Sequence, residues 1–168
     1  MSFVHLHCHT EFSLLDGAIR PGDLVKKAAA FGMPAVAVTD HGNMHAAVPF
    51  YQAATKAGVK PIIGCEVYVA PGAMTDRNAS SAKDAAFHLT LLAVNDEGYR
   101  NLVKLSTAGF LEGFYYKPRT DLPTLAKYAK GLIGFTGCLA SEVCQHLMRF
   151  FIDFARFTLA PFAFIFTR

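Results

Sequence analysis

The stretch Pro34-Ala35-Val36-Ala37-Val38-Thr39 is followed directly by Asp40-His41-Gly42-Asn43. An apolar run of this length is typical of a parallel strand that is covered on both faces of a sheet. The polar residues after it then lie where the strand ends. We therefore expect a buried strand over residues 34–39 that delivers Asp40 and His41 to the rim of a sheet.

Strand and helix signals alternate on both sides of this stretch. Pro21 near a helix start and Gly32 as a stop bound one helix, and Asn43 is expected to cap another that ends at Gly58. Alternation of this kind implies parallel β-α units, in a barrel or an open doubly wound sheet. The remaining expected elements are strands over residues 3–8, 60–69, 87–94 and 132–136, a loop over 71–84, and helices over 97–111 and 122–130.

Three histidines alternate near the start of the chain, in Val4-His5-Leu6-His7-Cys8-His9-Thr10. Side chains two residues apart point to the same side of a strand. If residues 3–8 form a strand, the three imidazoles line up and can converge on a cation. This pattern is the first indication of a metal site.

Further metal-ligand side chains fall at or near the ends of the expected strands. Barrels of β-α units collect their chemistry at the rim formed by successive strand ends. Imidazole, carboxylate and thiolate together favour zinc, or manganese and iron where carboxylates dominate. Two or three such ions suit phosphoester hydrolysis without a nucleophilic side chain. The residues are His7, His9, Asp40, His41, Glu66, His88 and Cys138, of which His88 fits least well because it begins its strand.

Single members of this set also have ordinary structural interpretations. A lone His88 on an apolar strand is more often a core histidine, and Cys138 alone is more often an inert thiol. Glu66 inside an apolar strand is harder to explain in this way, because a buried carboxylate is costly unless it is paired or bound to metal. Taken together, the residues favour a site.

Composition limits the number of domains and the class of protein. The 168 residues suit one domain with an ample core at 52% hydrophobic content, and a net charge of +3 is too small to imply nucleic-acid binding by itself. The four cysteines show no close-paired spacing, and the first residues lack a secretory signal. We therefore expect reduced thiols in a cytoplasmic protein.

Several motifs in order resemble a known family. His7-Cys8-His9-Thr10, Thr39 to Asn43 and Pro61 to Tyr68 are similar to successive motifs of the polymerase-and-histidinol-phosphatase (PHP) domain. Other segments resemble the form of this domain that opens bacterial replicative DNA polymerase III alpha subunits. These segments are residues 13–17, 87–92, 113–119 and 137–139.

The resemblance implies an α/β fold, a distorted TIM-like barrel of seven β-α units with up to three divalent metal ions, zinc or else manganese, iron or magnesium. His5 and Asp40 are expected to orient ligands rather than to bind metal themselves. Carried over residue by residue, the metal ligands fall on His7, His9, Asp16, His41, Glu66, His88 and Cys138.

The end of the chain departs from the family. The family closes its site with a late Asp-x-His pair, and none follows Cys138. We therefore expect a PHP domain over residues 1–147, with its barrel truncated before the last β-α units. Residues 148–168 form a Phe-rich tail that resembles a shifted reading frame or a fragment end. The uncharged run over 157–167 is about half of the roughly twenty residues that a membrane span requires, so no membrane association is expected.

Three functions follow from the resemblance. The first is metal-dependent phosphodiester hydrolysis of the 3′–5′ exonuclease type on single-stranded DNA, with Lys117 and Arg119 on the phosphate backbone. Lys117 and Arg119 can equally be interpreted as ordinary surface charges. The second is an inactive module that supports the downstream polymerase domains or docks a separate proofreading exonuclease. The third is a stand-alone phosphatase, which the polymerase-like residues 114–119 disfavour. Polymerisation is not expected, because the aspartates of the polymerase palm would lie downstream of this chain.

Overall fold

A computed structural model describes residues 3–82 and 84–150 of the chain. It has a mixed α/β fold, and the predicted α/β class is confirmed. Five strands form one sheet in the order β1-β2-β3-β5, and β4 pairs beside the end of β2. The strands are β1 (Ala35–Val38), β2 (Lys60–Val69), β3 (Phe87–Ala93), β4 (Arg119–Thr120) and β5 (Leu132–Phe135). The helices are α1 (Pro21–Ala30), α2 (Ala47–Lys56), α3 (Asp96–Leu111) and α4 (Leu122–Lys127), and residues 142–150 are also helical.

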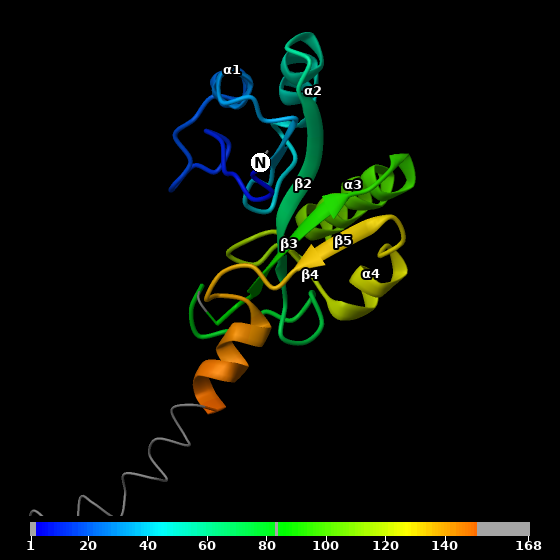
Figure 1. Cartoon of the computed structure of the whole chain (residues 1–168). Helices are drawn as coiled ribbons and strands as arrows, with labels where there is room; N and C mark the ends of the chain where they lie inside the picture. The colour runs from blue at the N-terminus through cyan, green and yellow to red at the C-terminus, as the bar shows by residue number, and fades with distance from the viewer. Residues whose placement is uncertain (1–2, 83, 151–168) are drawn as a thin grey trace, which may run out of the picture.

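Strand β2 is the central strand of the sheet (Figure 1). Its first half pairs with β1, from Lys60 opposite Ala35 onward, and its second half pairs with β3, from Gly64 opposite Leu92 onward. At this change of partner a Cβ on Gly64 would lie 2.5 Å from the Leu91 carbonyl oxygen. Only glycine therefore fits where β2 passes from one neighbour to the next.

Strand β3 runs antiparallel to β2, so the expectation of parallel β-α units is wrong for this strand. A parallel neighbour requires a crossover that is usually helical, and the described residues between β2 and β3, 70–82 and 84–86, contain no helix. The chain therefore turns back on itself. As a result His88, at the start of β3, lies opposite Tyr68 near the end of β2. The reversed direction places His88 at the same rim as the other candidate ligands.

Residues 3–8 do not form the regular strand that the alternating histidines suggest. The amide of Ala37 donates to the His5 carbonyl and that of Thr39 to the Cys8 carbonyl, both at 2.9 Å. Between these two bonds one segment advances by three residues and its partner by two. The ladder cannot stay regular across this mismatch, and the side-chain alternation is broken between His5 and Cys8.

Most helix boundaries agree with the sequence signals. Helix α1 begins at Pro21 and is followed by Gly32 at φ +65°, and α2 is followed by Gly58 at φ +69°. Asn43 does not cap α2, which corrects the prediction. Its Oδ1 accepts from the His45 amide instead, and the cap position is Ala46. Helix α4 ends at Lys127, earlier than the expected residue 130.

Two apolar cores lie in different parts of the fold. One is built from α1, β1 and α2 around Val36 and Phe50, and the other from β2, β3 and α3 around Cys65, Leu91 and Leu102. Because Cys65 faces the second core, Glu66 points to the opposite face of β2. No helix in the described parts of the chain is long and apolar enough to span a bilayer. Of the Phe-rich tail predicted over residues 148–168, residues 151–168 lie outside the described residues.

Candidate metal centre

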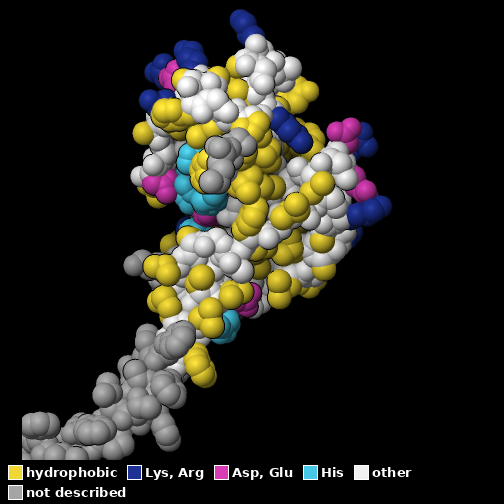
Figure 2. Space-filling view, in the orientation of Figure 1, with side chains coloured by type: hydrophobic (Ala, Val, Ile, Leu, Met, Phe, Trp, Pro, Cys, Tyr) yellow, Lys and Arg dark blue, Asp and Glu magenta, His cyan; other side chains and the backbone are white. Residues whose placement is uncertain are grey.

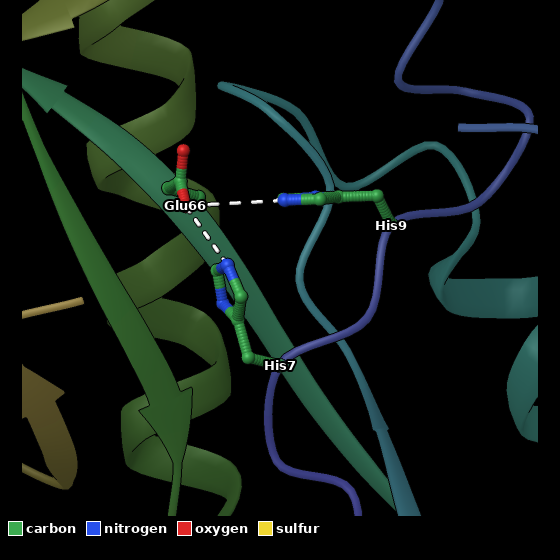
Figure 3. Close-up of side chains that lie close together, drawn as sticks. All are labelled: His7, His9 and Glu66. Carbon is green, nitrogen blue, oxygen red and sulfur yellow. Dashed lines mark ion pairs between the residues drawn. The ribbon is translucent and has the colours of Figure 1, made fainter. Parts of the chain in front are cut away.

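Glu66 is the hub of the candidate site. Its side chain is 2% exposed, and its Oε2 lies 3.0 Å from His7 Nε2 and 4.0 Å from His9 Nε2. Figure 3 shows both rings reaching from the N-terminal segment toward this carboxylate on β2. Histidine side chains also gather beside the N-terminal segment on the face seen in Figure 2. A carboxylate from the middle of the chain thus meets imidazoles from its beginning.

The other carboxylate oxygen of Glu66 faces two further histidines. Its Oε1 lies 2.8 Å from His41 Nδ1 and 2.6 Å from His88 Nδ1. Among the described residues, however, neither Glu66 Oε1 nor His41 Nδ1 makes a hydrogen bond of good geometry, although both atoms are buried. Buried polar atoms are normally satisfied, and an exception requires an explanation. A cation shared by these atoms would satisfy both, so the residues present fit a metal ion.

In the part of the chain that the structure describes, three overlapping groups of residues have ligand atoms within 4.8 Å of one another. Asp16 joins the set through its Oδ2, 2.8 Å from His41 Nε2, and the His9 and His41 rings stack with centroids 4.0 Å apart. Cys138 is exposed and lies at the edge, with Sγ 3.6 Å from His88 Nδ1. The groups are His7, His9 and Glu66; His9, Asp16 and His41; and His41, Glu66 and His88.

The charges of the site depend on one another. Burial by itself raises the pKa of Glu66, but contacts with His41, His7 and His88 outweigh it and hold that pKa well below its usual value. Contact with the Glu66 carboxylate, in turn, raises the pKa of His41. Burial and the neighbouring His41 lower the pKa of His9. Glu66 is therefore ionised at neutral pH, and His9 is neutral, as a metal ligand must be.

Asp40 orders the N-terminal segment without joining the clusters. It is 1% exposed, and its carboxylate accepts hydrogen bonds from the Thr10 amide at 2.6 Å, the Thr10 hydroxyl at 2.8 Å and the Ser13 hydroxyl at 2.7 Å. These bonds fix the turn that separates His9 from Asp16. His5 lies elsewhere: its ring packs on Phe3 with centroids 4.7 Å apart, and it belongs to none of the three groups.

Hydroxyl groups that no sequence pattern had singled out also position the ligands. The Nδ1 atom of His7 lies 3.2 Å from the Thr39 hydroxyl and 3.1 Å from that of Thr90. These contacts leave Nε2 of His7 facing Glu66. Thr90 is two residues beyond His88 and therefore on the same face of β3. That spacing was a signal that could have identified it.

The two expected DNA contacts differ in their surroundings. Lys117 is partly exposed, and its Nζ lies 4.4 Å above the ring of Tyr68, which is 5.0 Å from the His88 ring. Arg119 is 2% exposed, and its guanidinium donates to four backbone carbonyls. The expectation for Arg119 is wrong, because all its nitrogens are already used inside the fold. Its carbonyl partners are Gly113, Ala85, Met74 and Asp76.

A family model of the PHP domain matches residues 5–163. The chain therefore belongs to the PHP domain family. It is 54% identical over 161 residues to the DNA polymerase III subunit alpha of Deinococcus radiodurans, and 50% identical over 158 residues to that of Thermus aquaticus. The alignments cover 92% of this chain but 12% and 13% of those relatives, so the chain spans about an eighth of their length.

Among solved structures, an amidohydrolase of Chromobacterium violaceum aligns with a TM-score of 0.45 at 24% identity. The alignment covers 62% of this chain and 32% of that one.

Proposed function

We propose that this chain is the PHP portion of a replicative DNA polymerase III alpha subunit and that its metal centre hydrolyses phosphodiester bonds at the 3′ end of single-stranded DNA. The observation that carries the proposal is Glu66, a buried carboxylate that faces imidazoles with both oxygens. The polymerase relatives support DNA as the substrate, since the chain is about half identical to them over nearly its whole length.

The chain's own residues would divide the work. His7, His9, Asp16, His41, Glu66, His88 and Cys138 would hold the ions, and the two oxygens of Glu66 face different histidines. Bound divalent ions lower the pKa of a water molecule and stabilise a leaving oxygen. Asp16 and His7 are 54% and 39% exposed in their side chains, so the centre is open to a substrate on that side. Asp40 keeps the open side in place through Thr10 and Ser13.

Zinc is the metal we propose first, because imidazole and thiolate ligands outnumber carboxylates in the set; manganese, iron and magnesium are the alternatives. The four cysteines are free thiols in the structure. Reduced thiols suit the cytoplasm, where we place this protein.

A second function is favoured by the N-terminal segment. Residues 3–9 lack regular secondary structure, and His7 and His9 connect them to Glu66 on β2. Ions held there would brace the fold. In that role the domain would support the downstream polymerase domains or a separate proofreading exonuclease without itself being a catalyst.

An assay on two substrates separates these proposals. The purified chain, loaded with zinc or manganese, is given a 5′-labelled single-stranded DNA or a simple phosphomonoester. We expect shortening of the DNA from its 3′ end, lost in Glu66→Gln and kept in Glu97→Gln, whose parent residue is exposed and pairs with Lys130. Release from the monoester alone would defeat the DNA assignment. If bound metal raises the melting temperature and neither substrate is cleaved, the result would favour the structural role.

A further inference from the structure

A pocket of about 580 Å³ adjoins the candidate metal centre on the side of His88. Its size is within the usual range for sites that enclose small ligands. His88 lines the pocket and also belongs to a metal-ligand group, so the pocket lies next to that group. The other lining residues important here are Asp84, Phe87, Lys117, Gln145 and Arg149.

Local hydrogen bonds bring one wall of the pocket to the start of β3. The amide of His88 donates to the Ala140 carbonyl at 3.0 Å, which fixes the segment after Cys138 beside this strand. Ser141 is buried, and its hydroxyl accepts from the Cys144 amide where the helix over 142–150 begins. Gln145 and Arg149 are four residues apart on that helix and so share a face. The helix therefore presents Arg149 to the pocket.

The lining is positively charged on balance, and Phe87 contributes a phenyl ring to it. Within residues 3–82 and 84–150, neither Lys117 nor Arg149 forms an ion pair. Asp84 is the acid of the lining, and the Ser80 and Ser81 hydroxyls donate to it at 2.8 and 2.6 Å. Phe87 is partly buried. Cations beside an aromatic face are the combination that binds single-stranded nucleic acid without reading its sequence.

We propose that this pocket binds the nucleotide next to the scissile phosphate of a single DNA strand, with its base on Phe87 and its backbone phosphates between Lys117 and Arg149. The inference rests on the proposed function, because it takes single-stranded DNA as the substrate of the adjoining centre. Lys117 lies over the ring of Tyr68, which contacts the ring of His88. Lys117 therefore marks the end of the pocket nearest the metal ligands. Arg149, on the helix over 142–150, takes the role that the sequence had suggested for Arg119.

The test measures binding separately from hydrolysis. The metal-loaded chain is titrated into a fluorescent oligothymidine whose 3′-terminal linkages are phosphorothioates that resist cleavage, and anisotropy is followed at several salt concentrations. We expect Lys117→Gln and Arg149→Gln to weaken binding several-fold and each to reduce the salt slope by about 0.7, the value for one phosphate contact on a single strand. Phe87→Leu should weaken binding with an unchanged slope. Lys56→Gln, in the last turn of α2, is the matched control and should bind like the original chain.

Each result distinguishes the pocket from the hydrolysis. If Lys117→Gln and Arg149→Gln bind with the same affinity and the same salt slope as the control, the proposal that the pocket binds DNA is overturned. If those variants weaken binding but an unprotected oligonucleotide is never cleaved, the pocket stands and the proposed hydrolysis fails. If cleavage proceeds with an unchanged KM in both variants, the pocket is overturned and hydrolysis stands. The charge-retaining Lys117→Arg and Arg149→Lys should restore binding, which a mere folding defect in the glutamine variants would not explain.

Discussion

The N-terminal segment, residues 3–20, and the unit formed by β2, β3 and α3 are held in different ways. The segment is mostly exposed. Polar contacts to Asp40 and Glu66 order it, and only a few of its side chains, such as Phe12 and Ile19, pack against an apolar core. The β2-β3-α3 unit has a regular ladder and an apolar core around Leu91 and Leu102. One half of the candidate metal centre thus rests on a regular sheet with an apolar core, and the other half rests on polar contacts and, under the proposed function, on a bound cation. Loss of metal should loosen the first region and spare the second.

The largest effect is expected from a substitution in the apolar core of the β2-β3-α3 unit. Leu102 in α3 is fully buried, and Leu102→Ala should lower the free energy of unfolding by about 2–5 kcal/mol through lost burial and a residual cavity. Urea denaturation followed by circular dichroism measures it. The control is Leu111→Ala at the end of the same helix, where the side chain is 79% exposed and a change within about 0.5 kcal/mol is expected. Equal losses in both variants would contradict the assigned core.

The next largest effect is expected from a substitution that removes polar contacts of the N-terminal segment. Asp40→Asn places amide hydrogens against the donors of Thr10 and Ser13 and should cost about 2 kcal/mol. It should also weaken metal binding roughly 10–100-fold, as loss of a ligand-orienting partner does. Hydrogen exchange should accelerate over residues 8–17 while β2 and β3 stay protected. Asp23→Asn, an exposed pair with Lys26, is the control. Uniform deprotection of the sheet would show that the two regions are not separable.

A pH titration of metal affinity sharpens the comparison. The pKa of His41 is raised, chiefly by the Glu66 carboxylate, so in the metal-free site His41 still holds its proton above the ordinary value of about 6.5. A metal ion must displace that proton. Affinity should therefore be full above the raised pKa and fall about tenfold per pH unit below it. Competition against a chelating dye measures this slope. An affinity that stays constant as the pH falls below 6.5 would remove His41 from the ligands.

The smallest effect concerns a helix end far from the ligands. Asn95 caps α3, because its Oδ1 accepts from the Gly98 amide at 3.0 Å. Asn95→Ala should cost about 1 kcal/mol of stability and leave metal content unchanged. Asn78→Ala, in the exposed loop after β2, should cost nothing measurable. Thermal melts and metal analysis on the same samples check both statements. A lower metal content in Asn95→Ala would contradict the statement that this helix end is independent of the metal ligands.

The elements of the fold were predictable, but their directions were not. Apolar runs between Gly and Pro residues gave β2 its bounds at Lys60 and Val69, and α3 differs from its expected range by one residue. Side-chain periodicity is the same in parallel and antiparallel strands, so it could not show that β3 turns back. The helix-free loop over 71–84 was the available signal. The mismatch between residues 5–8 and β1 arises from pairing, which no local pattern reveals.

The residue types of the site were also visible in the sequence, because imidazoles and an acid on apolar strands are unusual. Six of the expected ligands lie in the three groups, with Cys138 beside His88; their binding of metal remains a prediction. The supporting hydroxyl of Thr39 was missed because threonine is common in strands. That of Thr90 was missed although its spacing of two residues from His88 was a usable signal. Arg119 was misjudged, since its burial depends on carbonyls more than thirty residues away, such as those of Met74 and Ala85.

Elemental analysis of the purified chain tests the central claim most directly, which is that Glu66 and the surrounding imidazoles hold divalent ions. The original protein and Glu97→Gln, each purified with zinc or manganese present and then desalted, should carry the same bound metal, and Glu66→Gln should fall to the level of the buffer. Background metal in the original protein, or an undiminished content in Glu66→Gln, would contradict the account.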